Sequence, residues 1–156
     1  MLSVRNGELN TYDYNEYFGQ VAFAAATMSF TSSSVTRSSG HKVNNEATYR
    51  FTALIDISSG HAIGTNTRIS LKLGENLLVN SATVQVTIVA GFGPNPPVQD
   101  THYSVTFLPD NWIDVIVIGT PDSPATTFTI DIAKVQNQGW AGTPGTFSIR
   151  LWENNY

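Results

Sequence analysis

The chain contains no cysteine, and charged residues make up only 13% of its 156 residues. Without cysteine, a disulfide framework, a thiol nucleophile and a cysteine-ligated metal are excluded. An ordinary soluble domain is about a quarter charged, so Thr, Ser, Asn and Gly supply most of the polar surface here. This composition favours an extracellular or cell-surface protein, and the low charge favours association with copies of itself.

Basic residues and long apolar runs are also scarce. The 8 Lys and Arg are spread thinly and the formal net charge is -4, which argues against a nucleic-acid partner. No apolar run approaches the roughly 20 residues of a membrane span, and no basic region followed by an apolar core begins the chain. We therefore expect no membrane span, and we expect a mature or excised segment of a surface protein in preference to a cytoplasmic protein.

Alternation of apolar and polar residues with a period of two is the main pattern that the chain does contain. The alternation recurs in short segments separated by Gly, Pro, Asn and Ser clusters, which predicts an all-β sandwich domain. We expect eight strands, at residues 21–31, 46–57, 68–73, 82–89, 103–107, 112–118, 126–135 and 146–152. The Ser-rich residues 31–45 are predicted to form a loop.

The same alternation predicts which side chains face the core. These are Ala47, Tyr49, Phe51, Ala53, Ile69, Leu71, Leu73, Val84, Val86, Ile88, Phe128, Ile130 and Ile132. The length suits one domain. Residues 1–20 are polar and aromatic without a clean period, so we separate them, as a donor strand or linker, from a β-sandwich domain of residues 21–156.

Five segments between residues 30 and 151 share a rhythm of residue types. They read ATYRFT at 47–52, RISLKL at 68–73, SATV at 81–84, FTIDIAKVQN at 128–137 and TPGTFSIR at 143–150. This rhythm resembles the Ig-like β-sandwich repeats of large secreted surface proteins, of the adhesin or fibre type. The resemblance implies an antiparallel sandwich of about seven to nine strands that serves as a spacer, stalk or adhesive module. Gly74 departs from the pattern, which has proline there, and residues 1–30 have no counterpart in it.

No motif for catalysis, a metal or a cofactor is present. The three histidines, His41, His61 and His102, are predicted in loops or at strand edges, whereas a metal site needs two or three to converge. No G-x-S-x-G elbow accompanies the serines. Asp110, Asn111 and Asp114 match no calcium loop, so we interpret them as turn residues that bond nearby amides. The sequence therefore predicts a protein that is not an enzyme.

The aromatic residues suggest a binding function. Trp140, Trp112, Tyr103 and Phe92 are candidates for a flat platform on which sugar rings stack, with hydroxyl groups bonded by Asn111, Gln138 and Asn154. Trp140 lies between Gly139 and Ala141 in a predicted loop, which favours exposure. The alternative is that Trp112 and Trp152 are core or rim residues at strand ends.

The N-terminal segment suggests a route to self-assembly. An open sandwich leaves edge strands unpaired, and this chain has little charge or proline to protect them. We predict that residues 2–20, with Tyr12, Tyr14, Tyr17 and Phe18, add as a strand to an edge of a neighbouring copy, and head-to-tail addition of this kind produces a fibre. The alternatives are an ordinary N-terminal strand in its own sheet, a carbohydrate-binding module, and a virus or phage capsid or fibre subunit.

Overall fold

The computed structural model describes residues 30–39, 42–56, 63–91, 97–119, 127–140 and 142–152. In this part of the chain it contains eight strands and no helix. The strands are β1 (Phe30–Ser39), β2 (Glu46–Ile55), β3 (Arg68–Lys72), β4 (Gln85–Ala90), β5 (Tyr103–Leu108), β6 (Trp112–Val117), β7 (Thr127–Gln136) and β8 (Ser148–Trp152). The prediction of an all-β chain is confirmed for these residues.

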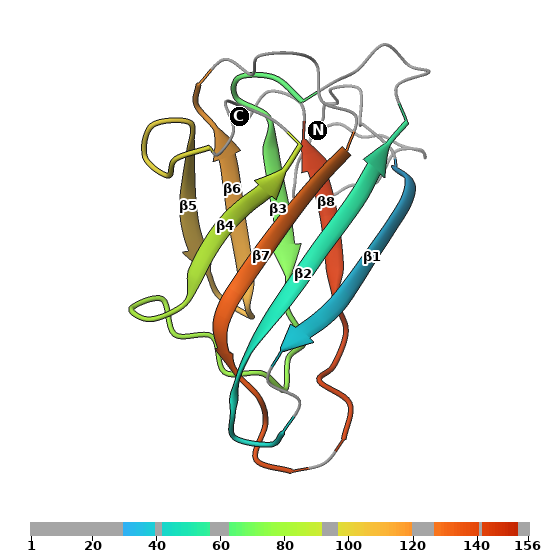
Figure 1. Cartoon of the computed structure of the whole chain (residues 1–156), viewed down its shortest axis with the longest axis vertical. Coiled ribbons are helices and arrows are strands. Elements are labelled where there is room, and N and C mark those ends of the chain that lie inside the picture. Colours follow the sequence, from blue (N-terminus) through green and yellow to red (C-terminus); the bar gives the residue numbers. More distant parts are fainter. Residues whose placement is uncertain are drawn as a thin grey trace, which may run out of the picture.

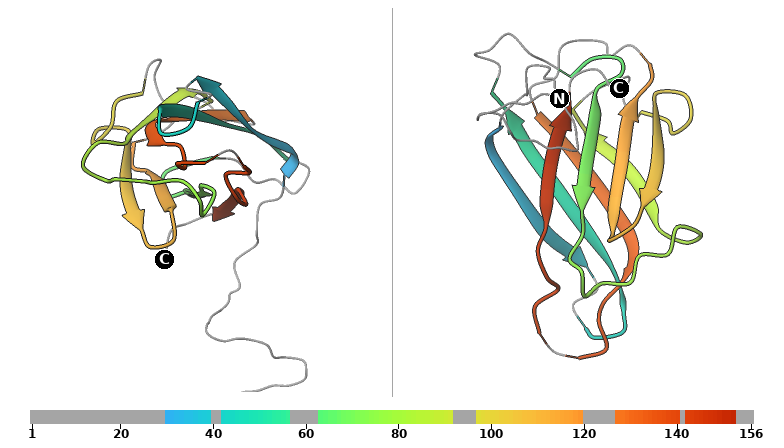
Figure 2. Two further views of the ribbon diagram at one scale, coloured as in Figure 1. Left: turned by 90° about the horizontal axis from the view of Figure 1, so that it is seen from below. Right: turned by 180° about the vertical axis from the view of Figure 1, so that it is seen from behind.

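The strands form two antiparallel four-stranded sheets that pack as a β-sandwich (Figure 1). The front sheet of Figure 1 has the order β1-β2-β7-β4, and the back sheet has the order β5-β6-β3-β8. The view from behind in Figure 2 shows the back sheet, with β8 at one edge and β5 at the other. Only β1–β2 and β5–β6 are hairpins, so every other connection crosses from one sheet to the other.

The core lies between the two sheets and is built from the alternating positions. Every side chain predicted to face inward is buried, and none is more than 8% exposed. Phe51 and Phe128, on adjacent strands of the front sheet, are completely buried and are the largest such side chains. Strands β2 to β8 also confirm the seven strands predicted between residues 46 and 152. The hairpin predicted around Pro109 to Asn111 joins β5 to β6.

The predicted loop at residues 31–45 is wrong for most of its length, because β1 occupies Phe30–Ser39. β1 is the edge strand of the front sheet and pairs only with β2 among the described strands. Within it, only Phe30 and Val35 pack partly against the core. A Ser/Thr strand with so few buried positions has no apolar alternation to detect. Most of the strand predicted at 21–31, and the boundary predicted after residue 20, lie outside the described residues.

A buried tyrosine links the two sheets directly. Tyr103 begins β5 in the back sheet, is 3% exposed, and donates its hydroxyl hydrogen to the carbonyl oxygen of Val86 in β4, at 3.2 Å. Val86 belongs to the front sheet. The hydrogen bond therefore supplements apolar packing at the side of the sandwich where β4 and β5 lie.

We expect Tyr103→Phe to lower the free energy of unfolding by about 1 kcal/mol, because it removes one net hydrogen bond while retaining the ring. Urea denaturation followed by circular dichroism measures this difference. An unchanged unfolding midpoint would show that the Tyr103–Val86 hydrogen bond does not help to join the sheets.

Candidate functional site

A pocket of about 240 Å³ lies where the β1–β2 turn meets the loop that follows β7. These two connections lie together at the lower end of the sandwich in Figure 1. The pocket is lined by Arg37, Lys42, Val43, Asn137, Gln138, Trp140 and Gly142. Trp140, which the sequence marks as a candidate ligand-binding residue, therefore lies in a pocket that also contains two basic side chains.

Asn137 holds the two connections together. Its Oδ1 accepts a hydrogen bond from the Tyr49 hydroxyl at 2.8 Å, and its Nδ2 donates to the carbonyl oxygen of Lys42 at 2.7 Å. The backbone N–H of Asn137 donates to Asn45, and the N–H of Asn44 donates to Gln138. Asn137 is only 2% exposed, so its polar atoms form the rigid floor of the pocket and not its ligand-binding surface.

Trp140 is the most exposed residue of the three described tryptophans, at 59%. Its loop is closed by Gln138, whose Nε2 donates to the carbonyl oxygen of Gly142 at 2.9 Å. A Cβ atom placed on Gly142 would lie 3.3 Å from both Cδ1 and Nε1 of the indole. The indole edge therefore lies against Gly142, where any larger residue would crowd it, and much of the ring surface stays in contact with solvent.

The electrostatic character of the pocket is positive. Arg37 and Lys42 are both exposed, and no carboxylate is among the residues that line the pocket. Arg37 also reaches the Tyr49 hydroxyl. Burial raises the pKa of Tyr49, while the hydrogen bond and the charge of Arg37 act in the opposite direction. Tyr49 therefore remains a neutral hydrogen-bonding group that helps to position the Arg37 side chain.

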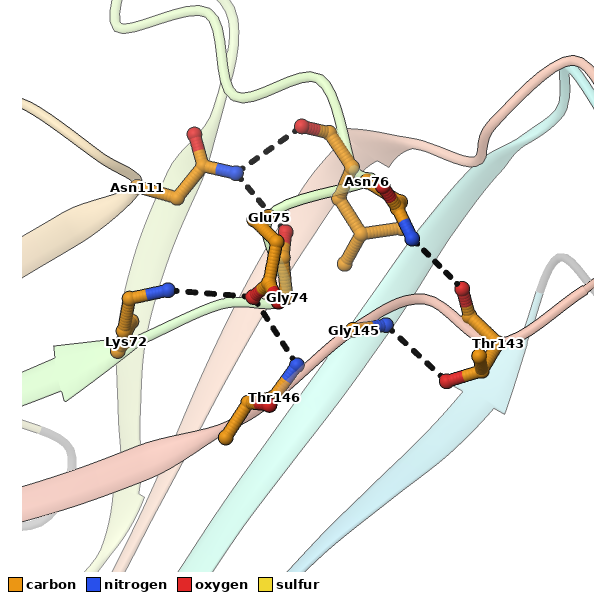
Figure 3. A network of polar contacts seen from close by, with 9 residues as sticks. Lys72, Gly74, Glu75, Asn76, Asn111, Thr143, Gly145 and Thr146 are labelled. Carbon is orange, nitrogen blue, oxygen red and sulfur yellow. Dashed lines mark hydrogen bonds and ion pairs between the residues drawn. The ribbon is translucent and has the colours of Figure 1, made fainter.

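The far end of the Trp140 loop is fastened to the β3–β4 turn (Figure 3). Asn76 donates its Nδ2 hydrogen to the carbonyl oxygen of Thr143 at 3.1 Å, and Glu75 Oε1 accepts from the Thr146 N–H at 3.1 Å and from Lys72 Nζ at 3.3 Å. A Cβ atom on Gly74 would overlap the carbonyl oxygen of Pro144. Close approach of the two backbones thus leaves no room for a side chain at position 74.

The three described residues of the predicted aromatic platform, Trp140, Trp112 and Tyr103, do not come together. Tyr103 is buried between the sheets, so it does not present a ring face. Trp112 is half-buried on β6, and the Arg150 guanidinium carbon lies 4.4 Å from its ring centroid. Phe92 lies outside the described residues, as do Tyr12, Tyr14, Tyr17 and Phe18. Of the three that are described, only Trp140 lines the pocket.

The two described polar residues predicted beside the platform, Gln138 and Asn111, lie in different places. Gln138 lies beside Trp140, as the short sequence spacing suggests. Asn111 instead donates its Nδ2 hydrogens to the carbonyl oxygens of Gly74 and Leu77, at 2.9 and 3.0 Å, and so supports the turn (Figure 3). Asn154 lies outside the described residues.

Arg37 and Lys42 are the pocket residues that sequence reasoning missed. Both fall in the segment predicted as a loop, about 100 residues before Trp140 in the chain. Their proximity depends on the pairing of β1 with β2 and of β2 with β7. The only signal available from the sequence is that two cations lie close together in a chain with few charged residues.

No group of His, Asp and Glu that could hold a metal ion occurs among the described residues. Asp114, considered above for calcium, accepts a hydrogen bond from the Ser70 hydroxyl at 2.6 Å, and its other oxygen lies 3.6 Å from Arg68. Nor does the described part of the chain contain a helix long and apolar enough to cross a membrane.

No protein-family model matches this chain, and no curated protein matches it either.

We expect Glu75→Gln to loosen the Trp140 loop in a pH-dependent way. The Thr146 N–H, assisted by the backbone N–H of Glu75 and by Lys72, lowers the pKa of Glu75 below 4.5. A lowered folded-state pKa stabilises the protein above about pH 4.5, and this contribution is lost as the pH falls through the folded-state value. Thermal unfolding at several pH values should show a deficit at pH 7 that shrinks as the pH falls below about 4.5. The matched control is Glu46→Gln, and a deficit independent of pH would contradict this role.

Proposed function

We propose that this protein is a non-enzymatic, Ig-like β-sandwich module of the cell surface or extracellular space that adheres to glycans through the Trp140 pocket. The observation that carries the proposal is an exposed tryptophan held at the rim of a polar pocket by a loop fastened at both ends. Large exposed aromatic residues combined with fixed polar groups are the usual composition of small-molecule binding sites.

The strand order supports the Ig-like part of the proposal. An Ig domain has one sheet of order A-B-E-D and pairs strand C with strand F in the other. The front sheet follows this order if β1, β2, β7 and β4 correspond to A, B, E and D. The β3–β8 pair then corresponds to C and F. In this scheme the β5–β6 hairpin is an addition beside strand C, between D and E.

The pocket has the chemistry for a sugar. The CH faces of a pyranose ring pack on an indole ring, while its hydroxyl groups need hydrogen-bond donors and acceptors nearby. Gln138 supplies an amide, with two donors and one acceptor, of which one donor is used by Gly142. Because the loop is already fixed by hydrogen bonds at both ends, less conformational entropy is lost on binding.

We expect Trp140→Ala to weaken glycan binding by at least about tenfold, because it removes the stacking surface. A glycan array of the intact protein identifies the oligosaccharide, and isothermal titration calorimetry measures its affinity. The matched control is Trp152→Ala, which removes a tryptophan from the outer face of the back sheet. Absence of binding to every glycan on the array would contradict the proposal, as would equal effects of the two substitutions.

A second candidate function, self-assembly into a filament, is favoured by the edge of the back sheet. β8 pairs with β3 on one side, and no other described strand pairs with it. Phe147 and Ile149, at this edge, are only partly buried although they pack against the core. In the Ig-like correspondence this is the position of strand G, so an added strand from residues 2–20 of a neighbouring copy would extend the sheet there.

We expect deletion of residues 2–20 to abolish concentration-dependent filaments and to leave a folded monomer, because β1 to β8 supply the described core without them. Negative-stain electron microscopy and light scattering across a concentration series measure both results. Filaments that persist after the deletion would exclude residues 2–20 as the connector. Closed shells formed by the intact chain would indicate the capsid-type alternative.

A further inference from the structure

We propose that the ligand of the Trp140 pocket is an acidic saccharide, whose uronic-acid carboxylate binds Arg37 and Lys42 while its ring stacks on Trp140. This inference rests on the proposed glycan-binding function and narrows it to one class of sugar.

The charge in the pocket is opposite in sign to that of the whole chain. The formal net charge is -4, with 12 Asp and Glu against 8 Lys and Arg. Two of those 8 basic residues line this one pocket, and none of the lining residues is acidic. Low-dielectric walls and a single sign of charge focus the field of a cleft on its ligand. The pocket therefore attracts an anion, although the protein as a whole repels one.

The two pocket cations are available for a ligand. Arg50, Arg68 and Lys72 each form an ion pair, with Asp131, Asp114 and Glu75 respectively. Within the described residues, neither Arg37 nor Lys42 has a carboxylate partner. Arg37 contacts the Tyr49 hydroxyl, and its guanidinium has further N–H donors beyond the one that this contact needs. The carboxylate of a bound ligand would form an ion pair with both side chains.

The backbone that carries Lys42 and one contact of Arg37 are fixed by buried residues. The carbonyl oxygen of Lys42 is bonded by Asn137, whose other amide atom is bonded by Tyr49, which in turn contacts Arg37. The planar fork of a guanidinium matches a carboxylate in a bidentate arrangement, and a lysine ammonium adds a point charge. Tyr49 thus contacts the Arg37 side chain and Asn137 fixes the Lys42 backbone, while the Lys42 side chain stays exposed.

The size of the pocket limits how much of the ligand it holds. Pockets for drug-sized molecules are about 300–1,000 Å³, whereas this one is about 240 Å³. A single sugar residue fits a pocket of this volume better than a long segment of polysaccharide. The remainder of an oligosaccharide would extend over the exposed face of Trp140. We therefore expect recognition of a single uronic-acid unit, at a chain end or within a flexible polymer.

The test compares acidic and neutral oligosaccharides of matched length on the intact protein by isothermal titration calorimetry. The acidic probes are oligogalacturonate, oligoalginate and hyaluronan fragments, and the neutral probes are oligomers of galactose and mannose. We expect an acidic probe to bind at least about tenfold more tightly, because hydrogen bonds to charged groups are the stronger ones. Its affinity should also fall with added salt.

The variants assign this preference to particular residues. Arg37→Gln and Lys42→Gln should each remove most of the preference for acidic sugar, and Arg37→Lys should restore part of it. The matched control is Lys134→Gln, an exposed lysine on β7 outside the pocket, and it should change nothing. Thermal unfolding of each variant shows that a loss of binding is not a loss of folding.

Two outcomes would overturn the inference of an acidic ligand, and both differ from the outcome that would reject glycan binding as a whole. Equal binding of neutral and acidic oligosaccharides that is lost in Trp140→Ala would leave glycan binding in place and exclude the acidic specificity. Binding of poly-glutamate as tight as that of the acidic sugars, and unaffected by Trp140→Ala, would reveal a site for charge alone. Binding of no oligosaccharide, here and on the glycan array, would reject both the inference and the proposed function.

Discussion

The burial of one alternating face of each sheet against the other is the constraint on which the rest of this molecule depends. Phe51, Phe128 and Ile130 from the front sheet meet Ile69, Leu71 and Ile113 from the back sheet, and all six are fully buried. Slipping any strand by one residue would turn its apolar side chains to solvent. The strand register is therefore fixed, and the connections at the ends of the sandwich are brought to fixed positions with it.

The Trp140 pocket is a consequence of that fixed register. β2 pairs with β1 on one side and with β7 on the other, so the turn before β2 and the loop after β7 must meet. Asn137 joins the β1–β2 turn rigidly to the loop after β7, because its buried amide forms hydrogen bonds with both Tyr49 of β2 and the Lys42 backbone. The pocket is thus supported by the core through Tyr49, whose ring lies 5.5 Å from that of Phe147.

The sequence predicts the scaffold better than it predicts the site, for a physical reason. A strand with two differently solvated faces has a period of two in its sequence, and β2, β3, β4 and β7 all show that period. β1 does not, because an edge strand of serine and threonine needs few apolar residues.

The exposure of Trp140 could also be predicted, since a tryptophan between small residues in a loop has little to pack against. The position of Arg37 and Lys42 in the same pocket as Trp140 could not be predicted, because it depends on which strands become neighbours. Tyr103 and Trp112 are predicted to bind a ligand, but Tyr103 is buried and Trp112 packs beside Arg150. An aromatic residue at a strand end looks the same in sequence whether it is buried, stacked or exposed.

Nuclear magnetic resonance provides the most direct test of the account, since the three tryptophans give three indole N–H signals. The protein, labelled with nitrogen-15, would be titrated with the oligosaccharide that binds most tightly on the array. We predict that the Trp140 indole signal shifts in a saturable way, together with the Gln138 side-chain amide, while the Trp112 and Trp152 signals stay in place. A saturable shift of Trp112 or Trp152 with an unmoved Trp140 signal would place the binding site on the outer face of the back sheet and contradict the central claim.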